Sequence, residues 1–299
     1  MRKFIGAIIV FALVFTVSSN LYAEDQPAAA APAAPAAPAA PAAEAAPAAA
    51  PAAPAVTGSA ALSVLNHYIF RGYELSSHSA VFQPTLTINY AGFSANLWSN
   101  IDTSEHATQN FAPVTTSRGH NNYDETDLTL NYTYNIDKLA LTGGFIYYGT
   151  QYAPETEEVY VSGTYDMIAH PTLAIYRDVN HYPGTYFNLS FSQSIPVYKE
   201  TTVDLGASFG YEYGSSNFWD TYSSSTGLYN GPKYSAFHDG MVKVGYTIPV
   251  TKMLSAQPVV QYWFPLSSDA SKITNGHAFN PNGQLKDIFV YGVNLTFSF

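Results

Sequence analysis

Charged and aromatic residues recur on the polar side of alternating segments along this 299-residue chain. Rings of charged side chains around a passage filter ions and polar solutes, and aromatic faces give sugars a surface to slide along. The residues that we expect to point into such a passage are His67, Arg71, Trp98, Asp127, Tyr148, Tyr160, Tyr176, Asp204, Asp239 and Lys243. An alternative stays open, in which the interior is closed by mutual neutralisation of four charges, those of Arg71, Asp127, Asp239 and Lys243.

Catalytic and metal chemistry have weaker support in the sequence. A hydrolase needs a serine, a histidine and a carboxylate or carboxamide in hydrogen-bond geometry. The one G-x-S-x-G match, residues 206–210 (GASFG), lies within a segment of strand alternation and not at a strand-to-helix turn, and the chain has no glycine-rich phosphate loop. Cysteine is absent, and the histidines expected in outer loops have no diagnostic ligand spacing. These are His78, His106, His120, His181 and His277. We therefore predict no enzyme activity, no cofactor and no metal site.

Acidic residues gather in or beside the segments that we expect to form outer loops. A solvated rim is the simpler interpretation, and the alternative is that they hold divalent cations which bridge lipopolysaccharide. The residues are Glu105, Asp124, Glu125, Glu155, Glu157 and Glu158.

The composition excludes most other classes of protein. Only 11% of residues are charged, whereas soluble domains average about 25%. Residues 4–17 form the one long apolar run, so the chain lacks the repeated spans of about 20 apolar residues that a helical membrane protein needs. A net charge of -10 argues against binding to nucleic acid. A charge-poor chain with 24 Tyr is typical of an outer-membrane β-barrel.

The N-terminal part predicts secretion and a linker. Residues 1–23 have the pattern of a signal peptide, with Arg2 and Lys3 before the apolar run and Ala23 at a plausible cleavage site. Residues 24–56 form an Ala/Pro-rich linker, in which residues 27–55 contain 20 Ala and 8 Pro. Regular prolines prevent a helix and favour an extended, polyproline-like spacer. We expect either a solvated periplasmic tether or a segment that contacts the cell wall.

Period-2 alternation from residue 57 to residue 299 predicts an all-β transmembrane barrel. Leu128 and Leu130, for example, alternate with Thr129 and Asn131. Small polar residues on one face suit a wet lumen, and large apolar residues on the other suit lipid. The pattern predicts about twelve antiparallel strands, near residues 58–72, 80–90, 93–102, 124–135, 138–149, 157–165, 171–178, 184–194, 201–211, 236–248, 252–263 and 287–299.

The connections alternate between short turns and longer polar loops, as the periplasmic turns and outer loops of such barrels do. An even number of strands places both chain ends on the periplasmic side. Aromatic residues are expected at the two membrane interfaces. Those at the turn ends are Tyr90, Phe93, Tyr134, Tyr165, Tyr246 and Phe297, and those toward the loop ends are Tyr68, Phe70, Tyr147, Tyr211, Tyr262 and Phe289.

The last strand, residues 291–299, alternates apolar and small polar residues and ends on an aromatic ring. It is similar to the C-terminal signal that the outer-membrane barrel assembly machinery reads, which makes that machinery an expected partner. The residues that would carry the signal are Tyr291, Leu295, Phe297 and Phe299.

Three stretches resemble the TorF-type porin family. They are residues 66–72 (NHYIFRG), similar to the family's acidic-Tyr-Val-Phe-Arg-Gly opening, residues 93–102 (FSANLWSNID), and the Tyr-Asp-Glu pattern at residues 123–125. His67 stands where the family usually has a carboxylate. The resemblance implies a bacterial outer-membrane barrel with a pore, and it supplies no catalytic residues.

Together these features predict an outer-membrane channel for passive diffusion of small hydrophilic solutes. Twelve strands lie between barrels that side chains fill and wide porins, so we expect a narrow lumen. The alternatives are a non-conducting anchor or adhesin, whose linker or loops bind a partner, and an outer-membrane hydrolase. Expected partners are outer-membrane lipid and lipopolysaccharide, small polar solutes and the cell wall.

Overall fold

The structure is a computed structural model that describes residues 54–76, 79–104, 122–151, 153–222, 226, 228–272 and 285–299. The predicted signal peptide and nearly all of the predicted linker lie outside these residues. Twelve strands of seven to fifteen residues dominate the described part. They are β1 (Thr57–Leu65), β4 (Val81–Tyr90), β5 (Phe93–Asp102), β6 (Asn122–Ile136), β7 (Leu139–Thr150), β8 (Thr156–Tyr165), β9 (Thr172–Asp178), β10 (Gly184–Tyr198), β11 (Thr201–Gly214), β14 (Ser235–Pro249), β15 (Leu254–Pro265) and β16 (Ile288–Ser298).

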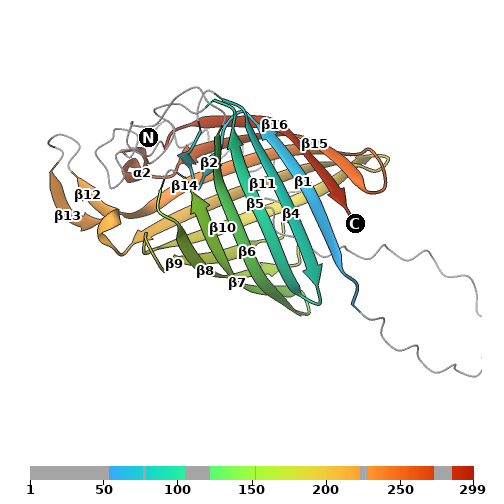
Figure 1. Ribbon diagram of the computed structural model, residues 1–299, viewed down its shortest axis with the longest axis horizontal. Coiled ribbons are helices and arrows are strands. Elements are labelled where there is room, and N and C mark those ends of the chain that lie inside the picture. The colour runs from blue at the N-terminus through green and yellow to red at the C-terminus, as the bar shows by residue number, and fades with distance from the viewer. Residues whose placement is uncertain are drawn as a thin grey trace, which may run out of the picture.

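These strands form one closed antiparallel barrel, which confirms the predicted fold class. Each strand pairs with its neighbours in chain order, and β1 closes the barrel against β16 (Figure 1). Two backbone hydrogen bonds between Gly58 and Phe299 continue the closing seam beyond the last pair of the ladder. The start of β1 and the C-terminus therefore lie at the same end of the barrel.

The outer wall of the barrel is apolar. Leu86, Ile88, Leu130, Leu189 and Val293 lie on four different strands, and each keeps between 39% and 46% of its surface exposed. The residues that alternate with them point inward and are mostly polar. A closed barrel satisfies every backbone hydrogen bond within its strands, which is the condition for crossing lipid. The apolar wall is thus a lipid-facing surface.

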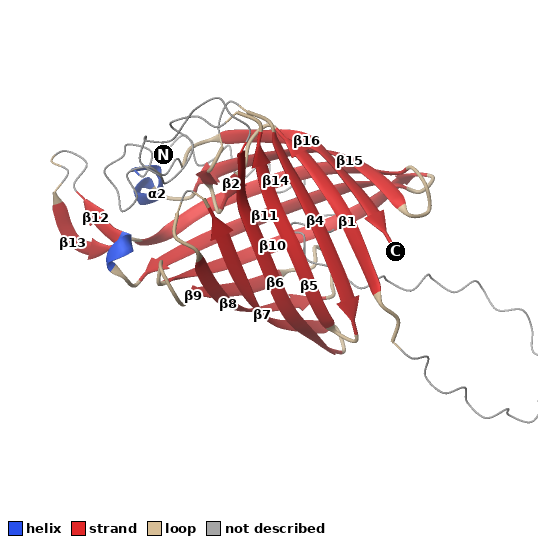
Figure 2. Cartoon of the chain, in the orientation of Figure 1, coloured by secondary structure: helices blue, strands red, loops and turns tan. Residues whose placement is uncertain are grey.

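The two ends of the barrel differ, and we call them the turn end and the loop end. At the turn end, two-residue connections such as Ala91–Gly92 link neighbouring strands. Both Ala91 and Gly92 have positive φ angles, of 52° and 88°, as the type I′ hairpin turn requires. At the loop end, the connections include two short strands, β12 (Asp220–Tyr222) and β13 (Tyr229–Lys233), which extend beyond the barrel (Figure 2).

Two short helices also lie at the loop end, η1 (Asn217–Trp219) and α2 (Ser268–Lys272). In the part of the chain that the structure describes, neither helix is long or apolar enough to cross a membrane.

The prediction of one strand over residues 58–72 is wrong. The first strand ends at Leu65, and the chain then forms a small hairpin from β2 (Ile69–Phe70) and β3 (Tyr73–Glu74). Arg71 and Gly72 connect these strands with positive φ angles of 47° and 79°. The other predicted strands match the observed ones to within a few residues. The largest extensions are those of β10 to Tyr198 and β11 to Gly214.

The position of this hairpin also shows that the predicted aromatic belt at the loop end is partly wrong. Tyr68 and Phe70 were expected at the outer membrane interface, but Tyr68 is 7% exposed and packs with Phe70 against a cluster of buried side chains inside the barrel. The six aromatic residues predicted at the turn end are all exposed. The lipid-facing belt is therefore better defined at the turn end than at the loop end.

Candidate functional site

The segment from Asn66 to Ser76, which we call the lumen hairpin, folds from the loop end into the barrel. Tyr73 forms an isolated β-bridge with Leu285, and its ring lies 4.9 Å from that of His238 on β14. A Cβ on Gly72 would lie 2.3 Å from Leu285 Cδ1 and 2.8 Å from Asp239 Cβ. Glycine at the tip therefore meets two needs, a positive φ and a close approach to the wall.

Arg71, at the tip of the lumen hairpin, reaches the opposite wall of the barrel. Its Nη1 donates to Glu158 Oε1 at 2.8 Å, and its Nη2 donates to Glu158 Oε2 at 2.7 Å. This two-point contact fixes the guanidinium plane as well as its charge. The guanidinium carbon also lies within 5 Å of three ring centroids, those of Phe70, Tyr176 and Tyr186, well inside the range of a cation–π contact.

The contacts of Arg71 continue into a network across the lumen. Tyr148 on β7 donates a hydrogen bond of 2.9 Å to Glu158 Oε2, and Tyr186 on β10 donates one of 2.9 Å to Asp239 on β14. Because these residues come from four different strands, the network connects distant parts of the wall. It narrows the passage at the level of Arg71.

The base of the lumen hairpin is held by a second group of charges. Glu74 accepts from Lys286 at 2.9 Å and lies 3.1 Å from Nδ1 of His67. The hydrogen bond that His67 donates to Glu74 raises the pKa of His67 above 6.5. Burial alone would raise the pKa of Glu74, but its contacts with His67 and Lys286 outweigh burial and lower it. Glu74 therefore attracts both His67, when it is protonated, and Lys286, whereas these two cations repel each other.

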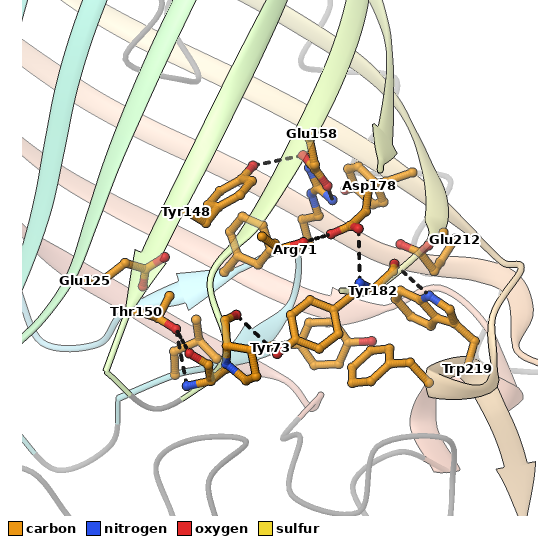
Figure 3. Close-up of a pocket in the computed structure, with 18 residues that line it drawn as sticks. Arg71, Tyr73, Glu125, Tyr148, Thr150, Glu158, Asp178, Tyr182, Glu212 and Trp219 are labelled. Carbon is orange, nitrogen blue, oxygen red and sulfur yellow. Dashed lines mark hydrogen bonds and ion pairs between the residues drawn. The ribbon is translucent and has the colours of Figure 1, made fainter. Parts of the chain in front are cut away.

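A cavity opens beside the lumen hairpin at the loop end (Figure 3). Counting the part that is open to solvent, its empty space is about 890 Å³. Its walls come from the lumen hairpin, from the loop ends of β6 to β11, and from the connections between them. Aromatic rings make up much of the lining, those of Phe70, Tyr73, Tyr148, Tyr182, Tyr186, Phe218 and Trp219.

The charged side chains of this cavity are mostly carboxylates. Glu125, Glu158, Asp178 and Glu212 line it, and among the described residues that do so Arg71 is the one cation. Arg71 compensates Glu158. Asp178 is held by the hydroxyl of Thr156 and by the backbone N–H groups of residues 180 and 182. Carboxyl groups therefore outnumber cations among the described residues that line the cavity.

Nearer the turn end, Asp204 on β11 organises a polar cluster. It accepts hydrogen bonds from Ser194, Thr202 and Thr247, and from the amide of Gln257 at 2.9 Å. Such a cluster spans neighbouring strands and fixes polar groups along the inner wall.

The ten residues predicted to line a passage all lie inside the barrel. Eight of them are on barrel strands, and two are on the lumen hairpin. Trp98, Asp127, Tyr148, Tyr160, Tyr176, Asp204, Asp239 and Lys243 point inward from strands. His67 and Arg71 belong to the lumen hairpin instead of the first strand. Their role in lining a conducting pore stays a prediction.

The expected neutralisation among Arg71, Asp127, Asp239 and Lys243 is not the pairing that the structure shows for Arg71, whose carboxylate partner is Glu158. The interpretation of the loop acids is also wrong for part of the set, because Asp124, Glu125 and Glu158 are each 5% exposed or less. All three already fall within the predicted strands 124–135 and 157–165, which argued against a place on a solvated rim. Glu105 lies outside the described residues.

The described residues contain no group of three or more His, Cys, Asp or Glu side chains placed to hold a metal ion. His78, His106, His120 and His277 lie outside the described part. His181 contacts the backbone carbonyl of Glu155 at 2.6 Å.

An apolar outer wall, a polar interior and complete closure together define a membrane-spanning β-barrel. The lumen hairpin carries Arg71 into a network of contacts that crosses the lumen. Beside the hairpin, at the loop end, lies the cavity lined by carboxyl groups and aromatic rings.

Comparison with solved structures returns other barrels. The chain is similar to a "NanC porin" (9% identity, TM-score 0.47, 81% of this chain and 99% of the other) and to a "KdgM porin" (11%, 0.45, 81% and 99%). It is also similar to the COG4313 outer membrane channel from Pseudomonas putida F1 (9%, 0.45, 86% and 100%). All three TM-scores lie below 0.5, so no inference about this chain rests on them. No protein-family model and no curated protein matches the sequence.

Proposed function

We propose that the chain is a porin-like channel of the bacterial outer membrane, through which small hydrophilic solutes diffuse passively. The observation that carries the proposal is the closed barrel with an apolar outer wall and a polar inner wall. A polar inner wall is the lining that a water-filled passage needs.

In this proposal the lumen hairpin is the constriction of the channel. Its tip carries Arg71 to Glu158 on the opposite wall and sets the width of the passage there. Solutes enter at the loop end through the acidic cavity and leave past the cluster around Asp204. The narrow section admits only small solutes. A barrel of twelve strands also favours a narrow lumen.

The linker and the partners belong to the same proposal. Because β1 begins at the turn end beside the C-terminus, the Ala/Pro-rich linker extends from that end, which we assign to the periplasm. There it is a tether within reach of the cell wall. The belt of exposed rings contacts lipid and, on the outer leaflet, lipopolysaccharide. The resemblance of residues 66–72 to the TorF-type porins fits this assignment, and we propose no catalytic role.

The proposal is tested by solute uptake into proteoliposomes. We expect purified full-length protein to admit small neutral sugars and to exclude larger oligosaccharides. Arg71→Ala removes the side chain that crosses the lumen, so the size limit should rise. Arg177→Ala is the matched control, because Arg177 contacts Thr185 and Ser215 near the loop end and does not reach Glu158. Failure of both the parent protein and Arg71→Ala to admit any solute would contradict the proposal.

A second function is favoured by one observation. The lumen hairpin is fixed at its tip by Glu158 and at its base by Lys286, so it has the contacts expected of a stable plug. With the lumen closed, the barrel would be a non-conducting anchor that presents its loops or linker to a partner. The uptake experiment separates the two functions directly.

A further inference from the structure

We infer that the cavity at the loop end binds neutral cyclic sugars, with a C–H face of the sugar on its aromatic rings and the hydroxyls against its carboxyl groups. This deepens the channel proposal by naming a solute class, and its transport step rests on that proposal. The binding step rests on the cavity alone. A pyranose ring has apolar C–H faces and a rim of hydroxyls. Small-molecule pockets likewise combine apolar and aromatic walls with a few placed polar groups.

The first support is a continuous aromatic surface in the cavity wall. The ring of Tyr182 lies 4.5 Å from that of Phe218, which lies 5.1 Å from Trp219. Tyr182 and Phe218 are half-buried, so part of each ring stays accessible. Aromatic faces are large, apolar and slightly negative, which suits the weakly positive C–H groups on the face of a sugar.

The second support is that the chain holds this aromatic surface in place by itself. A Cβ added at Gly184 would lie 2.6 Å from Trp219 Nε1, and one added at Gly214 would lie 2.2 Å from Trp219 Cβ. Glycine at both positions therefore leaves the space that the indole fills. Trp219 Nε1 also donates to the carbonyl of Tyr182 at 3.2 Å. A wall that is ordered before binding loses little entropy when a solute arrives.

The third support is a hydrogen-bond acceptor beside the rings. Glu212 lines the cavity, and its Oε1 lies close to Gly184, where an added Cβ would be 2.9 Å from it. Trp219 Nε1 approaches the same point, and Figure 3 shows Tyr182, Trp219 and Glu212 on one side of the cavity. A carboxyl group accepts hydrogen bonds from hydroxyls whether or not it is ionised. This contact therefore does not depend on the charge of Glu212.

The contacts of Arg71 favour a neutral sugar over a sugar acid. Arg71 is the one cation among the described residues that line the cavity. Both of its terminal nitrogens donate to Glu158, at 2.8 and 2.7 Å. An anionic solute would have to displace Glu158 from this two-point contact. A neutral sugar binds to the rings and the carboxyl groups without breaking it.

The test measures binding of methyl β-D-glucopyranoside and methyl β-D-galactopyranoside to purified full-length protein in nanodiscs, by tryptophan fluorescence. Sorbitol is one control, because it has the hydroxyls without a pyranose face. Cyclohexylmethanol is the other, because it has a ring with a single hydroxyl. We expect at least one glycoside to bind at least about tenfold more tightly than both controls. If neither glycoside binds more tightly than both controls, the inference is overturned.

Two variants locate the site. Tyr182→Leu removes an aromatic face, and Glu212→Met removes both carboxyl oxygens at a similar side-chain length. We expect each to weaken glycoside binding at least about fivefold. The matched control is Tyr213→Leu on β11, which makes the first change at an exposed residue that does not line the cavity, and it should keep the parent affinity.

Heat-modifiability on gels checks that each variant is a folded barrel. If Glu212→Met does not fold, Tyr182→Leu decides alone, because Tyr182 lies in the connection between β9 and β10 and outside the barrel strands. Parent affinity in every folded cavity variant would overturn the inference.

The same preparations separate this inference from the channel proposal. Conducting protein that binds neither glycoside more tightly than the controls would leave the channel proposal standing and overturn the sugar site. Glycoside binding that Tyr182→Leu weakens, in protein that never conducts, would support the site and contradict the channel.

Discussion

At the scale of single residues, the contact between Arg71 and Glu158 controls the position of the lumen hairpin. The pair is largely buried, with 13% and 7% of the side chains exposed. Removing one partner of a buried ion pair leaves an uncompensated charge, a loss of about 3–5 kcal/mol. That loss falls on the hairpin, because the surrounding barrel is held by its own ladder of hydrogen bonds.

The chain has no cysteine, so the labelling rate of a single introduced thiol measures how accessible the lumen hairpin is. We expect Leu75→Cys, which places the thiol at a buried position, to react slowly with a water-soluble maleimide. Adding Glu158→Gln should raise the labelling rate at least about tenfold, since Arg71 then lacks its anionic partner. Adding Glu157→Gln should not change it. Equal rates in the two double variants would show that the ion pair does not hold the hairpin.

The alternation of lipid-facing and lumen-facing side chains along each strand gives a second prediction about single residues. Leu189 on β10 is 40% exposed on the outer wall, and its neighbour Ser190 points inward. Leu189→Arg should lower the free energy of unfolding in lipid by about 2–4 kcal/mol, the cost of a cation on the lipid face near the midplane. Ser190→Arg should cost much less. Urea titrations of folded protein in vesicles measure both, and similar losses would mean that the lipid face is misassigned.

At the scale of elements, the base of the lumen hairpin depends on pH through His67, Glu74 and Lys286. The raised pKa of His67 means that its contribution is complete below 6.5 and is lost as the pH rises through the raised value. The lowered pKa of Glu74 means that its contribution is complete above 4.5 and is lost as the pH falls through the lowered value. The base is therefore most stable between about pH 4.5 and 6.5.

The maleimide labelling of Leu75→Cys also measures this pH dependence. Dividing the rate in a His67→Gln background by the rate in the parent background cancels the titration of the thiol itself. The ratio should be highest near pH 5.5 and fall toward one by pH 8.5, because neutral His67 no longer pairs with Glu74. A ratio that stays constant over this range would refute a role for His67 at the base.

The last strand carries a separate prediction about assembly. Phe299 pairs with Gly58 through backbone atoms, and its ring is half exposed. Phe299→Ser keeps the backbone bonds and removes the ring that the assembly machinery is expected to read. We expect the variant to reach the outer membrane in much smaller amounts, yet to refold in detergent nearly as well as the parent. Heat-modifiability on gels measures both, and normal amounts in cells would contradict the prediction.

The elements also show what could be predicted from sequence. Alternation located the twelve strands and placed the side chains of Asp127, Tyr148 and Asp204 inside, because a period of two is a direct consequence of strand geometry. The lumen hairpin was missed because Tyr68 and Phe70 continue the same alternation beyond Leu65. The Arg-Gly pair at residues 71 and 72 was the available signal, since a glycine after a polar residue suits a tight turn.

The whole molecule is a barrel whose outer wall follows from residue types, whereas its interior depends on long-range contacts. Arg71 meets Glu158, and Tyr73 meets Leu285, across more than 80 residues of sequence. No local pattern encodes such pairs. This is why the sequence predicts a passage and most of its lining, but not which carboxylate compensates Arg71 or that a cavity forms beside it.

The central claim for the whole molecule is that its lumen conducts. The direct test is single-channel recording of the purified full-length protein in planar bilayers, over a range of salt concentrations and in a salt gradient. We predict discrete steps whose size rises with salt, and a reversal potential that favours cations because carboxyl groups outnumber cations among the described residues that line the cavity. Verified insertion of many barrels without any steps, in the parent and in Arg71→Ala alike, would contradict the claim.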